Sequence, residues 1–169
     1  ERVIVPQVRG NYNHVFVLKQ KPNEKFKYIA EVRSMSNETG HSVLIQALYG
    51  NDDRSILFSL PHVKEQIPVG VVFKAMGFVT EEEIQNLIGV DDALLNPFLK
   101  FIIRDSFFCT TQQEALKYIG ERAMHILEND EEEDYAWQVV ENESLPHLGI
   151  SGSIKEQALF IGNIVKKLL

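Results

Sequence analysis

The distribution of apolar and polar residues divides the chain into a part with the period of β-strands and a part with the period of helices. Before Pro68, short runs of β-branched and aromatic residues alternate with turn signals such as Gly10-Asn11. These runs predict five strands, at residues 2–8, 14–19, 28–34, 42–48 and 55–60. Because short turns join them, we expect a small, mostly antiparallel sheet. In the run 14–19, apolar residues fill both alternating positions, which suggests that both faces of that strand are covered.

The period becomes helical from Ile67 onward. Pro68 fits the first turn of a helix, where its missing N–H costs no hydrogen bond, and Gly77 fits a left-handed stop. Lys64 and Glu65 lie on the approach to this helix. The segment predicts a buried helix and contains no reactive group arranged for chemistry.

Three capping boxes predict the starts of further helices. Each pairs a Ser or Thr with a Glu three residues later, and they begin at Thr80, Thr111 and Ser153. The helices that they open are predicted at residues 81–88, 112–127 and 154–168. Another is expected from about residue 91 to 103, where Pro97 leaves one helix and two shorter pieces as alternatives, and one more around Trp137. The predicted fold class is α+β, a small antiparallel sheet from the N-terminal part packed with several helices from the C-terminal part.

The composition is that of a globular protein. The chain has 169 residues, 44% of them hydrophobic and 24% charged, which suits one domain. No apolar stretch approaches the roughly 20 residues of a membrane helix, so no membrane partner is expected. Cys109, the single cysteine, excludes an internal disulfide and is interpreted as a buried, inert thiol rather than a catalytic one. Both ends of the chain resemble cuts within a longer polypeptide.

The formal net charge of −7 means that any contact with nucleic acid requires a local basic patch. Lysines flank the turn near residue 22, and they either touch phosphate or form the solvated tip of a hairpin. Arg33, at the end of a predicted strand, is either structural or faces a groove. The candidate nucleic-acid-facing residues are Arg33, Lys64, Lys19 and Lys21.

Candidate catalytic and metal sites are missing from the sequence. The five histidines show no zinc-ligand spacing, and no glycine-rich phosphate loop is present. His62 and His147 each follow a proline and are interpreted as turn residues whose rings bond backbone groups. The acidic run from Glu128 to Asp134 has six carboxylates in seven residues and is interpreted as a solvated loop rather than a metal site. We therefore predict no catalytic residue, no metal ligand and no cofactor in this domain.

Seven segments, in order along the chain, resemble one family. The chain is similar to the lobe domain of the second-largest subunit of multisubunit DNA-directed RNA polymerases, of the eukaryotic nuclear kind or a viral relative. The matching segments are ERVIVPQ (1–7), YIAEVRS (28–34), LPHVKEQIPVGVVFKAMG (60–77), TEEEIQNLIG (80–89), QEALKYIGER (113–122), ESLPHLG (143–149) and KEQALFIGNIVKKLL (155–169).

The resemblance implies a single lobe domain over residues 1–169, excised from a longer chain. Such a lobe is not catalytic itself: it belongs to a nucleotidyltransferase complex whose magnesium is bound elsewhere. It borders the channel for downstream DNA, docks transcription factors and assembles with other polymerase subunits, especially the largest. The expected location is the nucleus if the protein is eukaryotic, and the cytoplasm or virion if it is viral.

Two other interpretations remain open at the level of sequence. One is a free-standing acidic protein-interaction module without nucleic-acid contact, and the other is a small hydrolase that uses Cys109 or His62. The stretch VPQVRGN and the acidic segment between Gly120 and Leu145 depart from the family pattern. These departures leave open the polymerase class and the factors that dock.

Overall fold

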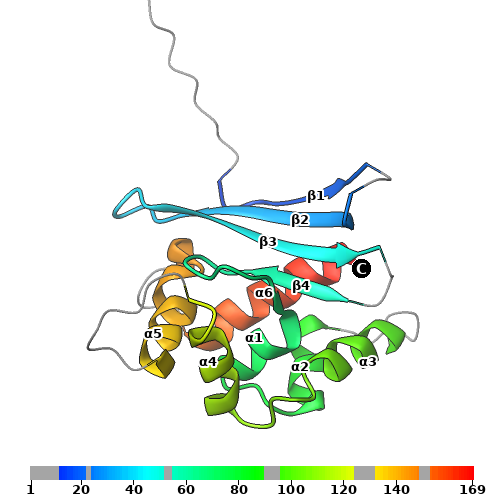
Figure 1. Ribbon diagram of the computed structural model, residues 1–169. Coiled ribbons are helices and arrows are strands. Elements are labelled where there is room, and N and C mark those ends of the chain that lie inside the picture. Colours follow the sequence, from blue (N-terminus) through cyan, green and yellow to red (C-terminus); the bar gives the residue numbers. More distant parts are fainter. Residues whose placement is uncertain (1–11, 22–23, 52–54, 90–95, 124–131, 149–152) are drawn as a thin grey trace, which may run out of the picture.

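An antiparallel sheet forms one layer of the molecule and helices form the other (Figure 1). The computed structural model describes residues 12–21, 24–51, 55–89, 96–123, 132–148 and 153–169. Within them the sheet has five strands in the order β1-β2-β3-β4-β5, and neighbours pair antiparallel. The strands are β1 (Val15–Lys19), β2 (Phe26–Met35), β3 (Ser42–Gly50), β4 (Ile56–Ser59) and β5 (Ile67–Pro68).

The predicted strands 14–19, 28–34, 42–48 and 55–60 correspond to β1 to β4, with ends that differ by at most two residues. The predicted strand 2–8 lies outside the described residues. The short strand β5 was not predicted, because Ile67 also fits the helical period that follows it. Ile67 instead pairs with Phe58 of β4, and Pro68 is the N-cap of the next helix rather than part of its first turn.

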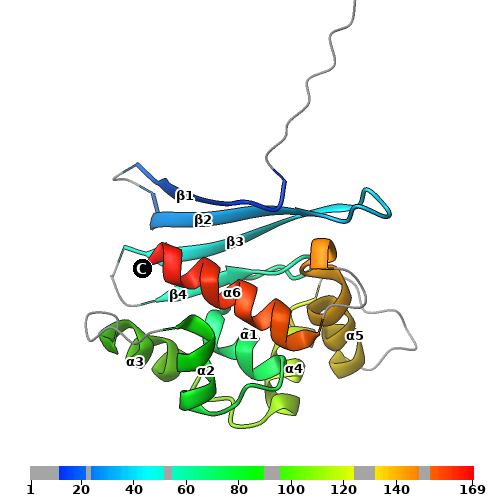
Figure 2. The ribbon, with the colours of Figure 1, turned by 180° about the vertical axis from the view of Figure 1, so that it is seen from behind.

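The helices lie together on one face of the sheet in both views (Figures 1 and 2). This arrangement confirms the predicted α+β class. A π-helical turn, η1, continues directly from α5, and a 3₁₀ turn, η2, follows it. The bounds are α1 (Val69–Ala75), α2 (Glu81–Ile88), α3 (Asn96–Asp105), α4 (Gln112–Gly120), α5 (Glu132–Gln138), η1 (Val139–Glu143), η2 (Pro146–Leu148) and α6 (Ile154–Leu168).

Two of the predicted capping boxes are complete. In α2 and α4 the threonine hydroxyl accepts from the N–H of the third helical residue, and the glutamate there accepts from the threonine N–H. The backbone N–H of Thr80 holds the pKa of Glu83 below its usual value, and that of Thr110 does the same for Glu114. At α6, Ser153 Oγ accepts from the Glu156 N–H at 3.3 Å. These caps explain why the helix starts were predictable.

Glycines end α1 and α2 as predicted. Gly77 follows α1 with φ 95°, and the N–H of Phe78 reaches back to the carbonyl of Phe73, which makes a Schellman ending. Gly89 caps α2 in the left-handed region at φ 66°. An L side chain rarely adopts either conformation, so glycine is required at both positions.

Two helical predictions need correction. Helix α4 ends at Gly120 rather than near residue 127, because Ala123 pairs with Val63 in an isolated β-bridge. Residues 132–134 of the acidic run form the first turn of α5 rather than a loop, while residues 128–131 lie outside the described ones. For the segment around Pro97, where one helix or two pieces were the alternatives, Pro97 is the second residue of α3, and residues 91–95 lie outside the described ones.

One hydrophobic core joins the two layers. Residues from every strand except β1, and from all six helices, contribute buried side chains to it. Helix α6 packs against β2 and against α2 and carries seven buried residues. Among the described helices, none combines the length and apolar character that a membrane crossing requires.

Candidate nucleic-acid and protein interface

The predicted basic patch occupies the turn between β1 and β2. Lys19 ends β1 and Lys21 lies in the turn. Across the turn, Lys25 Nζ lies 5.3 Å from the centre of the Phe26 ring, and Lys27 Nζ lies 6.0 Å from that of Tyr28. The fold therefore gathers these lysines at one end of a hairpin, which we call the lysine end.

Arg33 and Lys64 lie away from the lysine end. Arg33 is exposed on β2, opposite Leu44 of β3, and β2 continues to Met35, so Arg33 does not end its strand. Lys19 pairs with Tyr28, and Arg33 is five residues further along β2, about 17 Å at ~3.4 Å per residue. Lys64 follows β4, and its N–H donates to the Arg122 carbonyl at 3.0 Å. The four candidates thus do not form one continuous patch.

Among the described residues, no helix covers the outer face of the sheet near β1, because α6 lies against the opposite face, in front of β3 and β4 in Figure 2. On β1, Phe16 is 40% exposed and both Val17 and Leu18 are 43% exposed. Leu44 of β3 is also exposed. The expectation that both faces of this strand are covered is therefore wrong. The reason is that β1 lies at the margin of the sheet, where the helical layer does not enclose it (Figure 1).

Lys74 is buried in α1 and serves the fold. Its Nζ donates to the carbonyl oxygens of Ser106 and Cys109, both at 2.7 Å. Burial lowers the pKa of Lys74 and raises the pKa of the nearby Cys109 thiol. A buried thiol with a raised pKa has little thiolate, which agrees with the prediction that Cys109 is inert.

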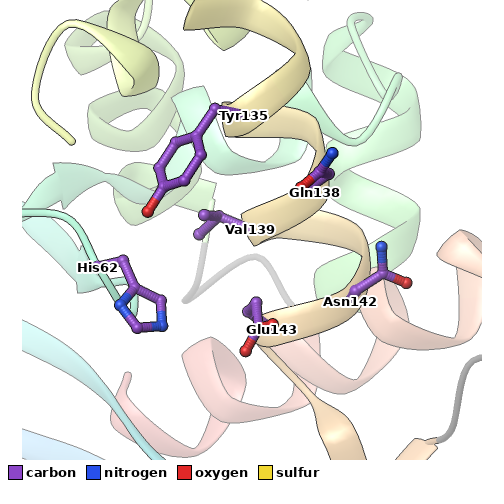
Figure 3. A pocket seen from close by; sticks show the side chains of 6 residues that line it. All are labelled: His62, Tyr135, Gln138, Val139, Asn142 and Glu143. Carbon is purple, nitrogen blue, oxygen red and sulfur yellow. The ribbon is translucent and has the colours of Figure 1, made fainter. Parts of the chain in front are cut away.

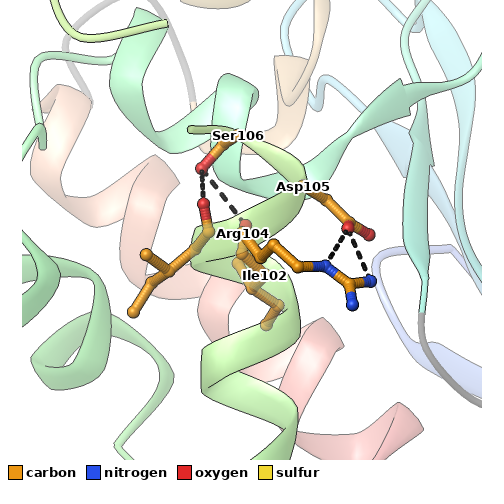
Figure 4. A network of polar contacts seen from close by, with 5 residues as sticks. Ile102, Arg104, Asp105 and Ser106 are labelled. Carbon is orange, nitrogen blue, oxygen red and sulfur yellow. Dashed lines mark hydrogen bonds and ion pairs between the residues drawn. The ribbon is translucent and has the colours of Figure 1, made fainter. Parts of the chain in front are cut away.

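Side-chain hydrogen bonds tie the turn after α3 back to that helix (Figure 4). Ser106 Oγ donates to the carbonyls of Ile102 and Ile103, both at 3.1 Å. A Cβ at Gly70 would stand 2.5 Å from that hydroxyl, so only glycine lets α1 approach so closely. The turn presents Phe107 to solvent with 77% of its surface exposed. These contacts are structural and offer no substrate position.

His147 is bonded to a side chain rather than to backbone, which corrects the prediction for its ring. Ser34 Oγ lies 2.7 Å from His147 Nδ1, and the same oxygen accepts from the His147 N–H at 3.1 Å. Burial lowers the pKa of His147. The pair joins β2 to η2 across 113 residues of sequence. No local sequence signal could have identified Ser34 as its partner.

His62 lies at a pocket between the β4–β5 turn and the α5–η1 helix (Figure 3). Its φ of 60° confirms that it is a turn residue. The pocket offers an imidazole, a phenol, amides and a carboxylate; its lining residues are His62, Tyr135, Gln138, Val139, Asn142 and Glu143. Glu143 also lies 3.6 Å from His41 Nε2. The described residues contain no group of three His, Cys, Asp or Glu side chains placed to hold a metal.

Comparison with known proteins identifies the family. The family model "RNA polymerase Rpb2, domain 2" matches residues 11–169. The chain belongs to this family, which is the lobe domain of the second-largest subunit of DNA-directed RNA polymerases.

Named relatives come from plants, viruses and archaea. The chain is 30% identical to "DNA-directed RNA polymerase II subunit 2" of Arabidopsis thaliana, with the whole chain and 15% of the relative covered. It is 30% identical to the "Probable DNA-directed RNA polymerase II subunit RPB2 homolog" of Invertebrate iridescent virus 6, with the same coverage. It is 29% identical to "DNA-directed RNA polymerase subunit Rpo2" of Sulfolobus acidocaldarius, again with the same coverage. The chain thus spans about 15% of the length of these relatives.

Proposed function

We propose that this chain is a non-catalytic lobe module of a DNA-dependent RNA polymerase that borders the DNA and docks transcription factors. The observation that carries the proposal is the family match over residues 11–169. The buried polar side chains described above agree with it, because they serve the fold: Lys74 holds the turn after α3, and His147 joins two elements. Other polymerase subunits, above all the largest, are the proposed partners, and the magnesium of catalysis is proposed to lie outside this domain.

The location follows from the same proposal. A eukaryotic polymerase of this kind works in the nucleus, and a viral one works in the cytoplasm or is carried in the virion. Relatives of both origins match the whole chain. The names of these relatives support both a nuclear and a viral polymerase as the assembly to which the chain belongs.

We assign the DNA-facing role to Arg33 and Lys64 rather than to the lysine end. Both side chains are exposed, and Arg33 lies well along β2 from the turn. Arg33 lies opposite one exposed apolar residue, Leu44, whereas Lys19 and Lys21 adjoin three on β1: Phe16, Val17 and Leu18. Phosphate does not cover apolar surface, so this second group is better suited to a protein partner.

Neutralising the two groups separately in the assembled polymerase tests this assignment. Changing both Arg33→Gln and Lys64→Gln should reduce the slope of log affinity for template against log salt by about 1 for each phosphate that the protein ceases to neutralise. The matched pair of changes Lys19→Gln and Lys21→Gln should leave the slope unchanged. The measurement is template binding at several salt concentrations. An unchanged slope with Arg33 and Lys64 replaced would contradict the DNA-bordering role and favour an interaction module without nucleic acid.

A further inference from the structure

Strand β1 is an edge strand of the sheet within the described residues. It stands first in the strand order and pairs only with β2. The N–H of Gln20 donates to the carbonyl of Lys27 directly opposite, at 3.0 Å, which makes them a hydrogen-bonded pair. In an antiparallel ladder such pairs alternate, so Phe16 and Leu18 also bond to β2. The N–H and C=O groups of Val15, Val17 and Lys19 therefore point away from the sheet.

This edge has little of the protection that proteins usually give to edge strands. Proline, bulges and inward-pointing charges normally block such edges. The sequence of β1 is VFVLK, with no proline and with its single charge at the end. The register with β2 is unbroken over all five residues. The middle of the strand is thus a regular template for another strand.

The side chains beside this edge are apolar on both faces. Phe16 and Leu18 lie on one face of the strand, and Val17, which pairs with Ala30, lies on the other. Each is about two-fifths exposed. A strand laid along β1 with apolar residues at alternate positions would help to cover them and would satisfy the outward backbone groups.

The charge around the edge indicates what the added strand carries. Four lysines and a single glutamate lie in the segment from Lys19 to Lys27, in a chain whose net charge is −7. The lysine end therefore favours carboxylates in whatever lies next to it. Duplex DNA is disfavoured, because placing its charged phosphates against apolar side chains would desolvate the phosphates, and phosphate oxygens cannot donate to the outward carbonyls.

We propose that an extended segment of another polypeptide of the polymerase, apolar at alternate positions and acidic at one end, adds to the sheet beside β1. Its backbone pairs with Val15, Val17 and Lys19, and its acidic end lies against Lys19 and Lys21. The proposal rests on the proposed function in one respect, that the partner belongs to a polymerase assembly.

Hydrogen exchange in the assembled polymerase tests the pairing, read at single amides. The amides of Phe16 and Leu18 bond to β2 and serve as internal references. If a strand is added, the amide of Val17 should exchange at least about 100-fold more slowly than in an unstructured peptide, as the references do. Exchange of Val17 near the unstructured rate, with Phe16 and Leu18 protected, would overturn the proposal.

A substitution and a crosslink identify the partner. A photoreactive phenylalanine analogue at position 16 of the full-length subunit should crosslink to an acidic, extended segment of a polymerase polypeptide. Val17→Pro removes an outward N–H and leaves the bonds to β2 intact, so it should lower the crosslink yield at least about tenfold. Val17→Thr keeps the N–H and the strand preference and should preserve the yield. Crosslinking to DNA, or an equal yield with proline, would refute the strand.

A second variant covers the case in which the proline variant fails to assemble. Lys19→Glu with Lys21→Glu changes side chains at the lysine end and should also lower the crosslink yield at least about tenfold, because it repels an acidic segment. An unchanged yield would overturn the charge argument. Failure of the DNA-bordering role would instead appear in the salt slope with Arg33 and Lys64 replaced. The two failures are therefore distinguishable.

Discussion

At the scale of single residues, Lys74 shows how a charged group becomes part of the core. The residue is only 8% exposed, and its ammonium group bonds the carbonyls of Ser106 and Cys109, the first just after α3. Carbonyls at and beyond a helix C-terminus lack the donors of a following helical turn. The Ser106 carbonyl accepts from the Cys109 N–H at 3.2 Å, and the lysine adds a second hydrogen bond to it and one to the Cys109 carbonyl, at a site where water has little access.

Replacing Lys74 with Met should destabilise the domain although it removes a buried charge. Two carbonyls lose this donor, which costs on the order of 1–3 kcal/mol in the free energy of unfolding. Urea denaturation measures the change. Lys117→Met, on the exposed face of α4, is the control and should change the free energy by less than about 0.5 kcal/mol. A Lys74→Met variant as stable as the original chain would show that the bonds contribute nothing net.

His147 makes stability depend on pH. Burial lowers its pKa in the folded state below the unfolded value of about 6.5, so the folded chain binds fewer protons in this range. Stability should then be lost as the pH falls below about 6.5. In the tautomer whose Nδ1 accepts from the Ser34 hydroxyl, protonation of Nδ1 would also end that hydrogen bond.

The measurement is Tm at pH 7.5 and pH 5.5. The unmodified chain should lose about 1–3 °C more between these two values than His147→Gln does, because the amide does not titrate. His62→Gln, at an exposed turn residue, should keep the full pH dependence. An identical pH response of His147→Gln and the unmodified chain would show that another group is responsible.

At the scale of elements, the crossing of α6 over α2 is set by Gly162. A Cβ there would lie 2.1 Å from the carbonyl oxygen of Leu87 and 2.6 Å from its carbonyl carbon. Helix propensity alone favours alanine over glycine by about 1 kcal/mol. The backbone of α2 cannot move aside as a flexible side chain could. The steric clash of an added Cβ therefore outweighs the gain in helix propensity.

Gly162→Ala should therefore destabilise the domain, by about 1–3 kcal/mol. Asn163→Ala, on the exposed face of the same helix, should be neutral or slightly stabilising. Denaturant unfolding of the two variants makes the comparison. A more stable Gly162→Ala chain would mean that the two helices can separate at little cost.

The elements whose boundaries were predictable are those with local chemistry at their ends. Thr80 and Thr111 cap helices and Gly89 ends one, as their sequence context indicates. The early end of α4 was not predictable, because Ala123 leaves the helix to pair with Val63, sixty residues earlier. The π-helical turn after α5 has no sequence signature of its own.

The candidate site was predictable to a similar extent. The sequence places Lys19 and Lys21 at a hairpin turn, and the structure confirms that position. The distance of Arg33 from this turn follows from the predicted hairpin, whereas the position of Lys64 depends on packing against the Arg122 region and could not be inferred. The exposure of Phe16 could not be inferred either, since an apolar strand looks the same in sequence whether a neighbour covers it or not.

At the scale of the whole molecule, α6 closes the core. It packs against β2 of the sheet layer and against α2 of the helical layer, and Gln157, Ala158 and Ile161 are among its buried residues. Without it, parts of both layers would expose apolar surface at the same time. The domain should therefore unfold as one unit only when α6 is present.

Removing residues 154–169 should abolish cooperative unfolding. The shortened chain is expected to bind a hydrophobic dye and to show no sharp transition in thermal denaturation, because the core is incomplete. Leu159→Ser, on the exposed side of α6, should retain the transition with little change in Tm. A sharp transition in the shortened chain would show that the first five helices and the sheet form a core without it.

The position of α6 also has a consequence for synthesis on the ribosome. The sheet and the helices α1 to α5 emerge first, yet the element that joins them is the last of the described helices to appear. Until it leaves the exit tunnel, the earlier segments hold exposed apolar surface that chaperones recognise. The nascent domain is thus expected to depend on such protection for most of its translation and to complete its folding only after residue 168 has emerged.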